Sequence, residues 1–236
     1  MIWDEPEASS SISRLKIKKK INEKGLKLVG FHSLLYTRPD LQFFRDENSR
    51  KKTIDYLINL IKICAELGGK NLILGSPSNR MLHGKSYKKC FDQSIEDFKE
   101  LGIKAKEFDI NFCIEPLAKN ISEFICTNQE GASLVKSVGH SNFKLHLDTK
   151  TIYENSDDIE LFLEKNINIC EHIHISEINL APLTNKLFNH SNFSKALKKY
   201  KYDKFLSIEM RKDQKNKKEN IKKSIFFLRK NYLTNE

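Results

Sequence analysis

Short apolar runs rich in β-branched and aromatic residues alternate along the chain with longer segments of helical period. This alternation predicts parallel strands joined by crossover helices, and therefore an α/β fold. Helices are predicted at about 9–24, 48–67, 87–108, 128–138, 157–165, 190–200 and 215–231. Six strands are predicted, at 27–35, 71–75, 111–116, 143–148, 171–176 and 205–209.

Four of the predicted strands end in a side chain that can bind a metal or transfer a proton. In barrels of parallel strands the loops after the strands form the active face, so such residues collect at the carboxyl ends. Alternate residues of a strand share a face, which allows all four side chains to point into one barrel mouth. The four are Glu115, Asp148, His174 and Glu209, and the residues two positions before them on the same face are Cys113, His146, His172 and Ser207.

Taken one at a time, each of the four residues also has a simple structural explanation. An acidic residue after a strand often caps the next helix, and a lone histidine is often a hydrogen-bonded core residue. Four of them at successive strand ends favour a shared site instead. Two glutamates, an aspartate and a histidine suit Mn²⁺ or Mg²⁺, and the imidazole is compatible with Zn²⁺ or Co²⁺.

A divalent metal in such a site can hold adjacent hydroxyl and carbonyl oxygens of a sugar. It then stabilises the enediolate that forms when a neighbouring C–H proton is removed. Glu115 and Glu209 come from well-separated strands. They can therefore flank the substrate as base and acid, as an epimerase requires.

The formal net charge of +10 raises the question of a polyanionic partner. The lysines concentrate at 16–20, 198–204 and 212–223, in segments that read as polar faces of outer helices or their flanks. The segments 16–20 and 212–223 lack interleaved aromatic residues for base stacking, and the segment 198–204 contains only Tyr200 and Tyr202. The pattern favours a solvated helix surface over nucleic-acid binding.

The cysteines and the apolar runs bear on the compartment. The five cysteines are odd in number, widely spaced and never in a CxxC pair, which argues against disulfides and a zinc knuckle. No apolar run approaches the roughly 20 residues of a membrane span. The residues after Met1 also lack the basic start and apolar stretch of a signal peptide. We therefore expect a cytoplasmic protein that does not contact the membrane.

The order and spacing of Glu115, Asp148, His174 and Glu209 resemble those of the xylose isomerase-like barrel superfamily. The similarity is to its sugar phosphate isomerase/epimerase branch, which contains the ketose 3-epimerases, and it extends from about residue 3 to 211. The segments that carry it are GFHSLLYTRPDLQFF, LILGSPSNR, CIEPL, FKLHLDT, HIHISEINLAP and YDKFLSIEMR.

This resemblance implies a (β/α)8 barrel with a metal held by Glu115, Asp148, His174 and Glu209, the two glutamates being the acid and base. It also implies substrate contacts from the same rim, although solvent-exposed or packing roles are an alternative for these residues. Arg80 and Lys150 are placed to bind a phosphate or carboxylate. The full set of candidates is His32, Ser76, Asn79, Arg80, Lys119, Lys150, Glu177 and Arg211.

Two positions depart from the branch. Thr151 stands where epimerases of this type often carry a histidine, and Leu180 stands where they often carry an arginine. We therefore expect substrate handling to differ from theirs.

The strand count departs as well, because the family's barrel has eight strands and only six are predicted. We expect a single barrel domain over 1–236, truncated at its N-terminus and lacking the first two strands. Its end strands, 27–35 and 205–209, would then be unpaired unless a second copy of the chain covers them.

Three functions are compatible with these observations. The first is a metal-dependent isomerase or epimerase of a small sugar or sugar phosphate. The second is a zinc-dependent endonuclease at abasic DNA sites, which shares the superfamily and suits the positive charge but needs several more histidines. The third is a truncated barrel without catalytic activity.

Overall fold

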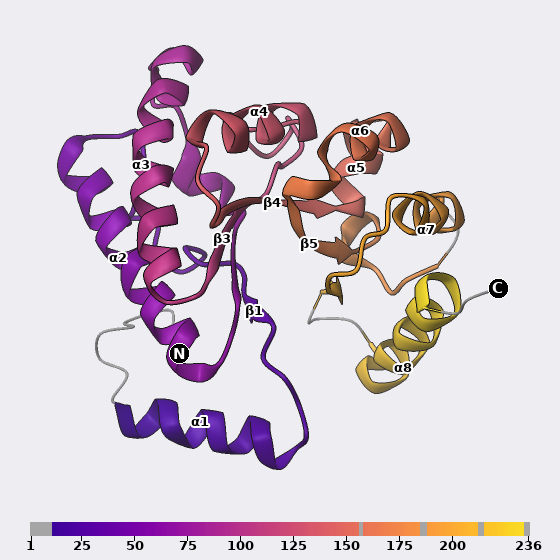
Figure 1. Ribbon diagram of the computed structural model, residues 1–236. Coiled ribbons are helices and arrows are strands. Elements are labelled where there is room, and N and C mark those ends of the chain that lie inside the picture. Colours follow the sequence, from indigo (N-terminus) through magenta and orange to yellow (C-terminus); the bar gives the residue numbers. More distant parts are fainter. Residues whose placement is uncertain (1–10, 156–157, 185–187, 212–214, 234–236) are drawn as a thin grey trace.

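The computed structural model describes residues 11–155, 158–184, 188–211 and 215–233. Within them, six parallel strands form one sheet in which each strand pairs with its neighbours in sequence. The order is that of part of a β/α barrel, so the predicted six-stranded parallel fold is confirmed (Figure 1). The strands are β1 (Gly30–Phe31), β2 (Asn71–Leu74), β3 (Asn111–Ile114), β4 (Phe143–Asp148), β5 (Cys170–Ile175) and β6 (Leu206–Ile208).

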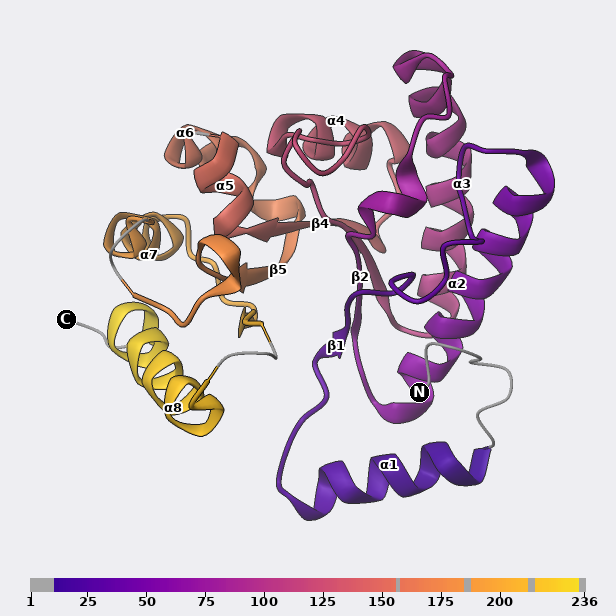
Figure 2. The ribbon, with the colours of Figure 1, turned by 180° about the vertical axis from the view of Figure 1, so that it is seen from behind.

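Helices follow the strands around the outer side of the curved sheet, from α2 near one end to α8 near the other (Figure 1). Figure 2, seen from behind, likewise places α1 beside the β1 end and α8 beside the β6 end. The helices are α1 (Ser11–Glu23), α2 (Glu47–Leu67), α3 (Tyr87–Glu107), α4 (Asn128–Val138), α5 (Thr149–Asn155), α6 (Ile159–Asn166), α7 (His190–Lys199) and α8 (Lys217–Leu228), with single turns at Pro77–Arg80, Ile167–Ile169, Ile178–Leu180 and Arg229–Leu233. None of these described helices is long and apolar enough to cross a membrane.

Local sequence signals fix where the longer helices begin and end. The Asp46 side chain caps α2 by accepting from the Ser49 backbone N–H, and α2 ends at Gly68 in the left-handed conformation. Helix α4 starts with a capping box, in which Thr127 and Glu130 each accept from the other's backbone. These caps define the loops that connect the carboxyl ends of β1 and β3 to their helices.

The core between sheet and helices is built from aromatic and aliphatic side chains. Phe98 of α3 stacks on Phe143 of β4, with ring centroids 5.0 Å apart, and also contacts Phe112 of β3. All three rings are buried. Burial of such large apolar side chains holds β3 and β4 firmly against the helical layer, and this fixes the positions of the strand ends that follow. The five cysteines are buried with free thiols.

The end strands are shorter than predicted. Strand β1 spans two residues instead of 27–35, because the chain turns at Ser33, whose φ is 56°. Helix α5 and the turn Pro77–Arg80 were not predicted, since both are too short to show a helical period. Predicted helical positions 9, 10 and 157 lie outside the described residues.

Candidate functional site

The four strand-end residues lie together at the carboxyl end of the sheet. Asp148 and His174 are register partners on β4 and β5, while Glu115 and Glu209 directly follow β3 and β6. His174 Nδ1 lies 3.8 Å from Asp148 Oδ2 and 3.4 Å from Glu209 Oε2. The parallel register therefore brings together side chains that are far apart in sequence.

Gly75 at the end of β2 leaves space for the Glu115 carboxylate. A Cβ at this position would lie only 2.4 Å from Glu115 Oε2. A larger residue would push the carboxylate out of its place. Gly75 thus contributes to the site because the absence of a side chain makes room for the Glu115 carboxylate.

The side chains that could hold a metal fall into overlapping groups that share His174. Glu115, His146, Asp148 and His174 each offer one ligand atom, and these atoms lie within 4.8 Å of one another. His32, His174 and Glu209 form a second such group, and His146, His172 and His174 form a third. The structure therefore adds His146 beside the predicted ligands and groups Glu209 with His32.

Two buried nitrogens in this cluster lack hydrogen-bond partners, namely His146 Nε2 and His174 Nδ1. Their nearest carboxylate oxygens belong to Glu115, at 3.9 Å from His146, and to Glu209, at 3.4 Å from His174. The first separation is too long for a hydrogen bond, and the second lacks the geometry of one. Buried polar atoms are rarely left unpartnered, so imidazole nitrogens facing carboxylates fit a bound divalent cation.

The carboxylates differ in their affinity for protons. Burial, together with the nearby Asp148 and Glu209, raises the pKa of Glu115 to about 8. Burial and Glu209 raise the pKa of Asp148 to about 6. Burial also opposes ionisation of Glu209, but the adjacent His174 prevails and lowers the pKa of Glu209 to about 2. The site thus contains one carboxyl group that retains a proton near neutral pH and one that releases it readily.

Hydrogen bonds and close contacts from neighbouring residues orient the side chains of Asp148 and His146. Ser176 Oγ donates to Asp148 Oδ1 at 2.6 Å and the Lys150 backbone N–H donates to the same oxygen at 2.7 Å, so that Oδ2 is the oxygen nearer His174. The Nδ1 atoms of His146 and His172 lie 3.3 Å apart, and His172 Nε2 lies 2.8 Å from Ser207 Oγ. Such contacts fix the rotamers of ligand side chains.

The family model described as xylose isomerase-like TIM barrel matches residues 3–231. The chain belongs to this family. The resemblance identified from the strand-end residues is therefore confirmed. Thr151 and Leu180, the two positions at which we expect substrate handling to differ, both line the pocket beside the carboxylates.

A curated relative of this xylose isomerase-like barrel is the D-psicose 3-epimerase of Ruminiclostridium cellulolyticum. It is 32% identical over 89 residues, which is 38% of this chain and 30% of the relative. The match therefore spans less than a third of that epimerase.

Solved structures share the fold over most of the chain. D-Psicose 3-epimerase with D-tagatose from Clostridium cellulolyticum aligns with a TM-score of 0.76 at 21% identity, covering 93% of this chain and 77% of that one. 3-Keto-D-glucoside 4-epimerase from E. coli aligns at 0.80 and 15%, covering 93% and 85%. An AP endonuclease, family 2, from Brucella melitensis aligns at 0.72 and 18%, covering 86% and 79%. At these identities the similarity establishes the fold alone.

A pocket of about 250 Å³ opens beside the carboxylates. This volume is slightly below the roughly 300–1,000 Å³ of pockets for drug-sized ligands, so it suits a smaller ligand. Three of the predicted substrate-binding residues, His32, Ser76 and Lys150, line it together with Glu115, Asp148 and Glu209.

The other predicted substrate-binding residues do not line this pocket. Asn79 donates to the Arg38 and Leu41 carbonyls and fixes the loop after β1. Arg80 is fully buried and donates to the Glu115 carbonyl at 3.1 Å, behind the site. Glu177 is buried and accepts from the backbone and hydroxyl of Thr184, and the two remaining candidates, Lys119 and Arg211, are exposed.

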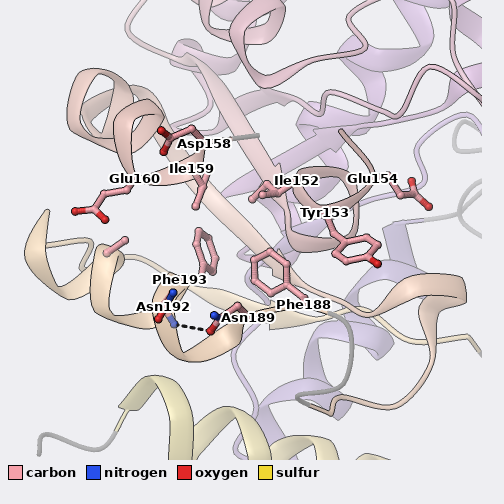
Figure 3. Close-up of a pocket in the computed structure, with 11 residues that line it drawn as sticks. Ile152, Tyr153, Glu154, Asp158, Ile159, Glu160, Phe188, Asn189, Asn192 and Phe193 are labelled. Carbon is pink, nitrogen blue, oxygen red and sulfur yellow. Dashed lines mark hydrogen bonds between the residues drawn. The ribbon is translucent and has the colours of Figure 1, made fainter. Parts of the chain in front are cut away.

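A larger pocket of about 710 Å³ lies between α5, α6 and α7 (Figure 3). Phe188, Phe193, Ile152 and Ile159 face one another across it, and three acidic side chains lie around them. It contains none of the strand-end residues and no histidine or cysteine. The strand-end residues that can bind a metal or transfer a proton therefore lie at the smaller pocket.

Proposed function

We propose that this chain is a divalent-metal-dependent epimerase or isomerase of a small sugar. The observation that carries the proposal is a pair of carboxyl groups, Glu115 and Glu209, that line one pocket together with Asp148. They come from β3 and β6, with two strands between them. Such a pair can accept a proton on one side of a carbon atom and supply one on the other.

The metal would be held by Glu115, Asp148, His174 and Glu209. It would stabilise the negative charge that develops on sugar oxygens during proton transfer. Mn²⁺ and Mg²⁺ are the expected ions, and Zn²⁺ and Co²⁺ are compatible with the imidazole. Asp148 keeps its orientation through Ser176 Oγ and the Lys150 backbone.

In the reaction, Glu209 is ionised and accepts the proton from the carbon next to the sugar carbonyl. Glu115 supplies a proton to the other face of the same carbon, which inverts its configuration. Leu117, Ile121 and Leu180 border the pocket and limit the access of water.

The charges at the pocket favour an uncharged sugar over a sugar phosphate. Lys150 is the one cationic lysine or arginine among the described pocket-lining residues, and its Nζ lies 2.8 Å from Glu154 Oε2. Three acidic side chains line the same pocket. A phosphate placed there would meet more negative charge than positive.

The direct test is exchange of the carbon-bound hydrogen with solvent. The protein is incubated with Mn²⁺ and D-fructose, D-psicose or D-tagatose in D₂O, and ¹H NMR follows loss of the signal next to the carbonyl while chromatography follows the epimer. We expect exchange and epimer formation, both reduced at least about 100-fold in Glu115→Gln and Glu209→Gln. The matched control Glu100→Gln, on the exposed face of α3, should retain full exchange. Absence of exchange with each of a broad set of ketoses and aldoses would contradict the proposal.

The abasic-site endonuclease stays an alternative, supported by the net charge and the shared fold. The same preparation with Zn²⁺ and a DNA duplex carrying one abasic site separates the two functions. Strand cleavage without sugar exchange would favour the endonuclease. Failure of both assays, with metal bound, would favour the truncated barrel without catalytic activity.

A further inference from the structure

In the metal-capable group of Glu115, His146, Asp148 and His174, His146 is the one residue that the predicted ligand set does not include. It lies on β4 two residues before Asp148, so both side chains point to the same face of the sheet and His146 lies one layer deeper. It is completely buried, and its ring centroid lies 4.2 Å from that of His174 in a T-shaped contact. It therefore forms the floor of the site.

The two ring nitrogens of His146 differ in their contacts. Its Nδ1 faces His172 Nδ1 at 3.3 Å, whereas its Nε2 has no hydrogen-bond partner and lies 3.9 Å from Glu115 Oε1. A histidine with a purely structural role in the core is expected to have both nitrogens satisfied. The unsatisfied nitrogen is the one that faces the carboxylates.

We propose that His146 Nε2 is a direct ligand of the metal, so that Glu115, His146, Asp148 and His174 form a set of two imidazoles and two carboxylates. The four offer ligand atoms that lie within 4.8 Å of one another. This inference rests on the proposed function, because it concerns the same metal site, and it changes which residues hold the metal.

The hydrogen bonds behind His146 match this role. A metal ligand needs a lone pair on Nε2, so the proton of the neutral ring resides on Nδ1 and is donated to His172 Nδ1. His172 then carries its own proton on Nε2 and donates it to Ser207 Oγ, 2.8 Å away. An outer partner that fixes the tautomer is typical of histidines that bind metals.

Two consequences follow for the site. A set with two imidazoles favours Zn²⁺, Co²⁺ or Fe²⁺ over Mg²⁺ more strongly than a set with one. Glu209, which belongs to the group with His32, is then not a metal ligand. Its carboxylate can therefore exchange protons with the substrate.

The test counts imidazoles on the metal. Pulsed EPR of the Mn²⁺-loaded full chain, prepared with natural-abundance and with ¹⁵N-labelled histidine, should detect two coordinated imidazoles in the wild type and one in His146→Gln. Calorimetry should show that the preference for Zn²⁺ over Mg²⁺ falls at least about tenfold in this variant, since loss of even an outer partner changes metal affinity by that order. Circular dichroism verifies that the variant is folded, and His146→Leu provides a second substitution.

The matched control is His172→Gln, which removes the outer partner and should leave two imidazoles on the metal. A single imidazole in the wild type, or an unchanged count in both His146 variants, would overturn the inference while leaving the proposed function intact. Two imidazoles in a protein that exchanges no sugar protons would uphold the inference and overturn the function. Absence of any bound metal would overturn both.

Discussion

Glu115 is the residue whose surroundings have the clearest measurable consequence. Its carboxyl group is held in a buried site beside Asp148 and Glu209, and its pKa is raised from 4.5 to about 8. Burial opposes the charged form of His174, but the surrounding carboxylates prevail and raise its pKa above 6.5. Both groups therefore bind protons more tightly in the folded protein than in the unfolded chain.

From these shifts we predict that the metal-free protein loses stability as the pH rises from about 7.5 to about 8.5, because Glu115 still binds a proton in the folded state but not in the unfolded chain. The pKa values of five histidines are lowered, but above about pH 7.5 these rings are largely neutral in the unfolded chain as well and do not oppose the trend; they are His32, His140, His146, His172 and His190. Urea unfolding with a chelator present, at pH 7.5 and 8.5, measures the effect.

The control for this prediction is Glu115→Gln, which removes the Glu115 titration and should reduce the pH dependence. A wild-type protein whose stability rises across the same window would contradict the assignment of a retained proton to the carboxylate cluster. Added Mn²⁺ should also reduce the dependence, because a bound cation displaces these protons.

At the residue scale, the sequence predicts that the four strand-end residues lie together, because the carboxyl ends of successive parallel strands face one barrel mouth. It does not predict which of them share a metal. Strand alternation places His146 on the same face as Asp148, but whether its Nε2 finds a partner depends on the packing of β3, β4 and β5. Arg80 could not be placed either, since the turn at Pro77–Arg80 directs it behind Glu115.

At the scale of elements, the pairing of α2 with α3 depends on a buried charge. Arg50 of α2 donates through Nε to Asp97 Oδ1 of α3 at 2.8 Å, and Gln93 donates to the other oxygen. The Asp97 side chain is fully buried, whereas that of Arg50 is 27% exposed. These helices cover β2 and β3. Gly75 and Glu115 of the site directly follow these two strands.

We predict that Asp97→Ala destabilises the protein by about 3 kcal/mol, because it leaves the Arg50 guanidinium without its buried partner. Asp92→Ala, on the same helix, removes an exposed ion pair with Lys88 and should cost less than about 1 kcal/mol. Urea unfolding of both variants gives the comparison. Equal effects would show that the buried pair does not hold the two helices together.

The elements themselves are largely predicted by hydrophobic period and by caps such as Thr127 with Glu130. What the sequence does not predict is the length of the end strands. The apolar run at 27–35 has the composition of a full strand, but only Gly30–Phe31 pairs, because the chain turns at Ser33 and β1 has one neighbouring strand within the described residues. Strand length there depends on the tertiary surroundings and not on local preference alone.

At the scale of the whole molecule, the described sheet has two open edges. Strand β1 pairs with β2 and β6 pairs with β5, and each leaves its other side unpaired within the described residues. Phe205, just before β6, is 46% exposed, and Phe226 of α8 is 69% exposed. Unpaired parallel edges next to exposed aromatic residues favour association with another chain.

We therefore predict that the purified protein is a homo-oligomer at micromolar concentration. Light scattering coupled to size-exclusion chromatography measures the mass directly, and Phe226→Ser together with Phe205→Ser tests whether the β6 end carries the contact. A stable monomer over the whole concentration range, without aggregation, would contradict the prediction.

The proposed chemistry depends on one cation bound where the strands β3 to β6 end. Anomalous diffraction at the manganese edge, from crystals grown with Mn²⁺, locates that ion directly. We predict one strong peak about 2.2 Å from oxygen or nitrogen atoms of Glu115, Asp148 and His174, and its loss in Asp148→Asn. Ordered density for these side chains with no peak among them, or a peak only elsewhere on the molecule, would contradict the central claim.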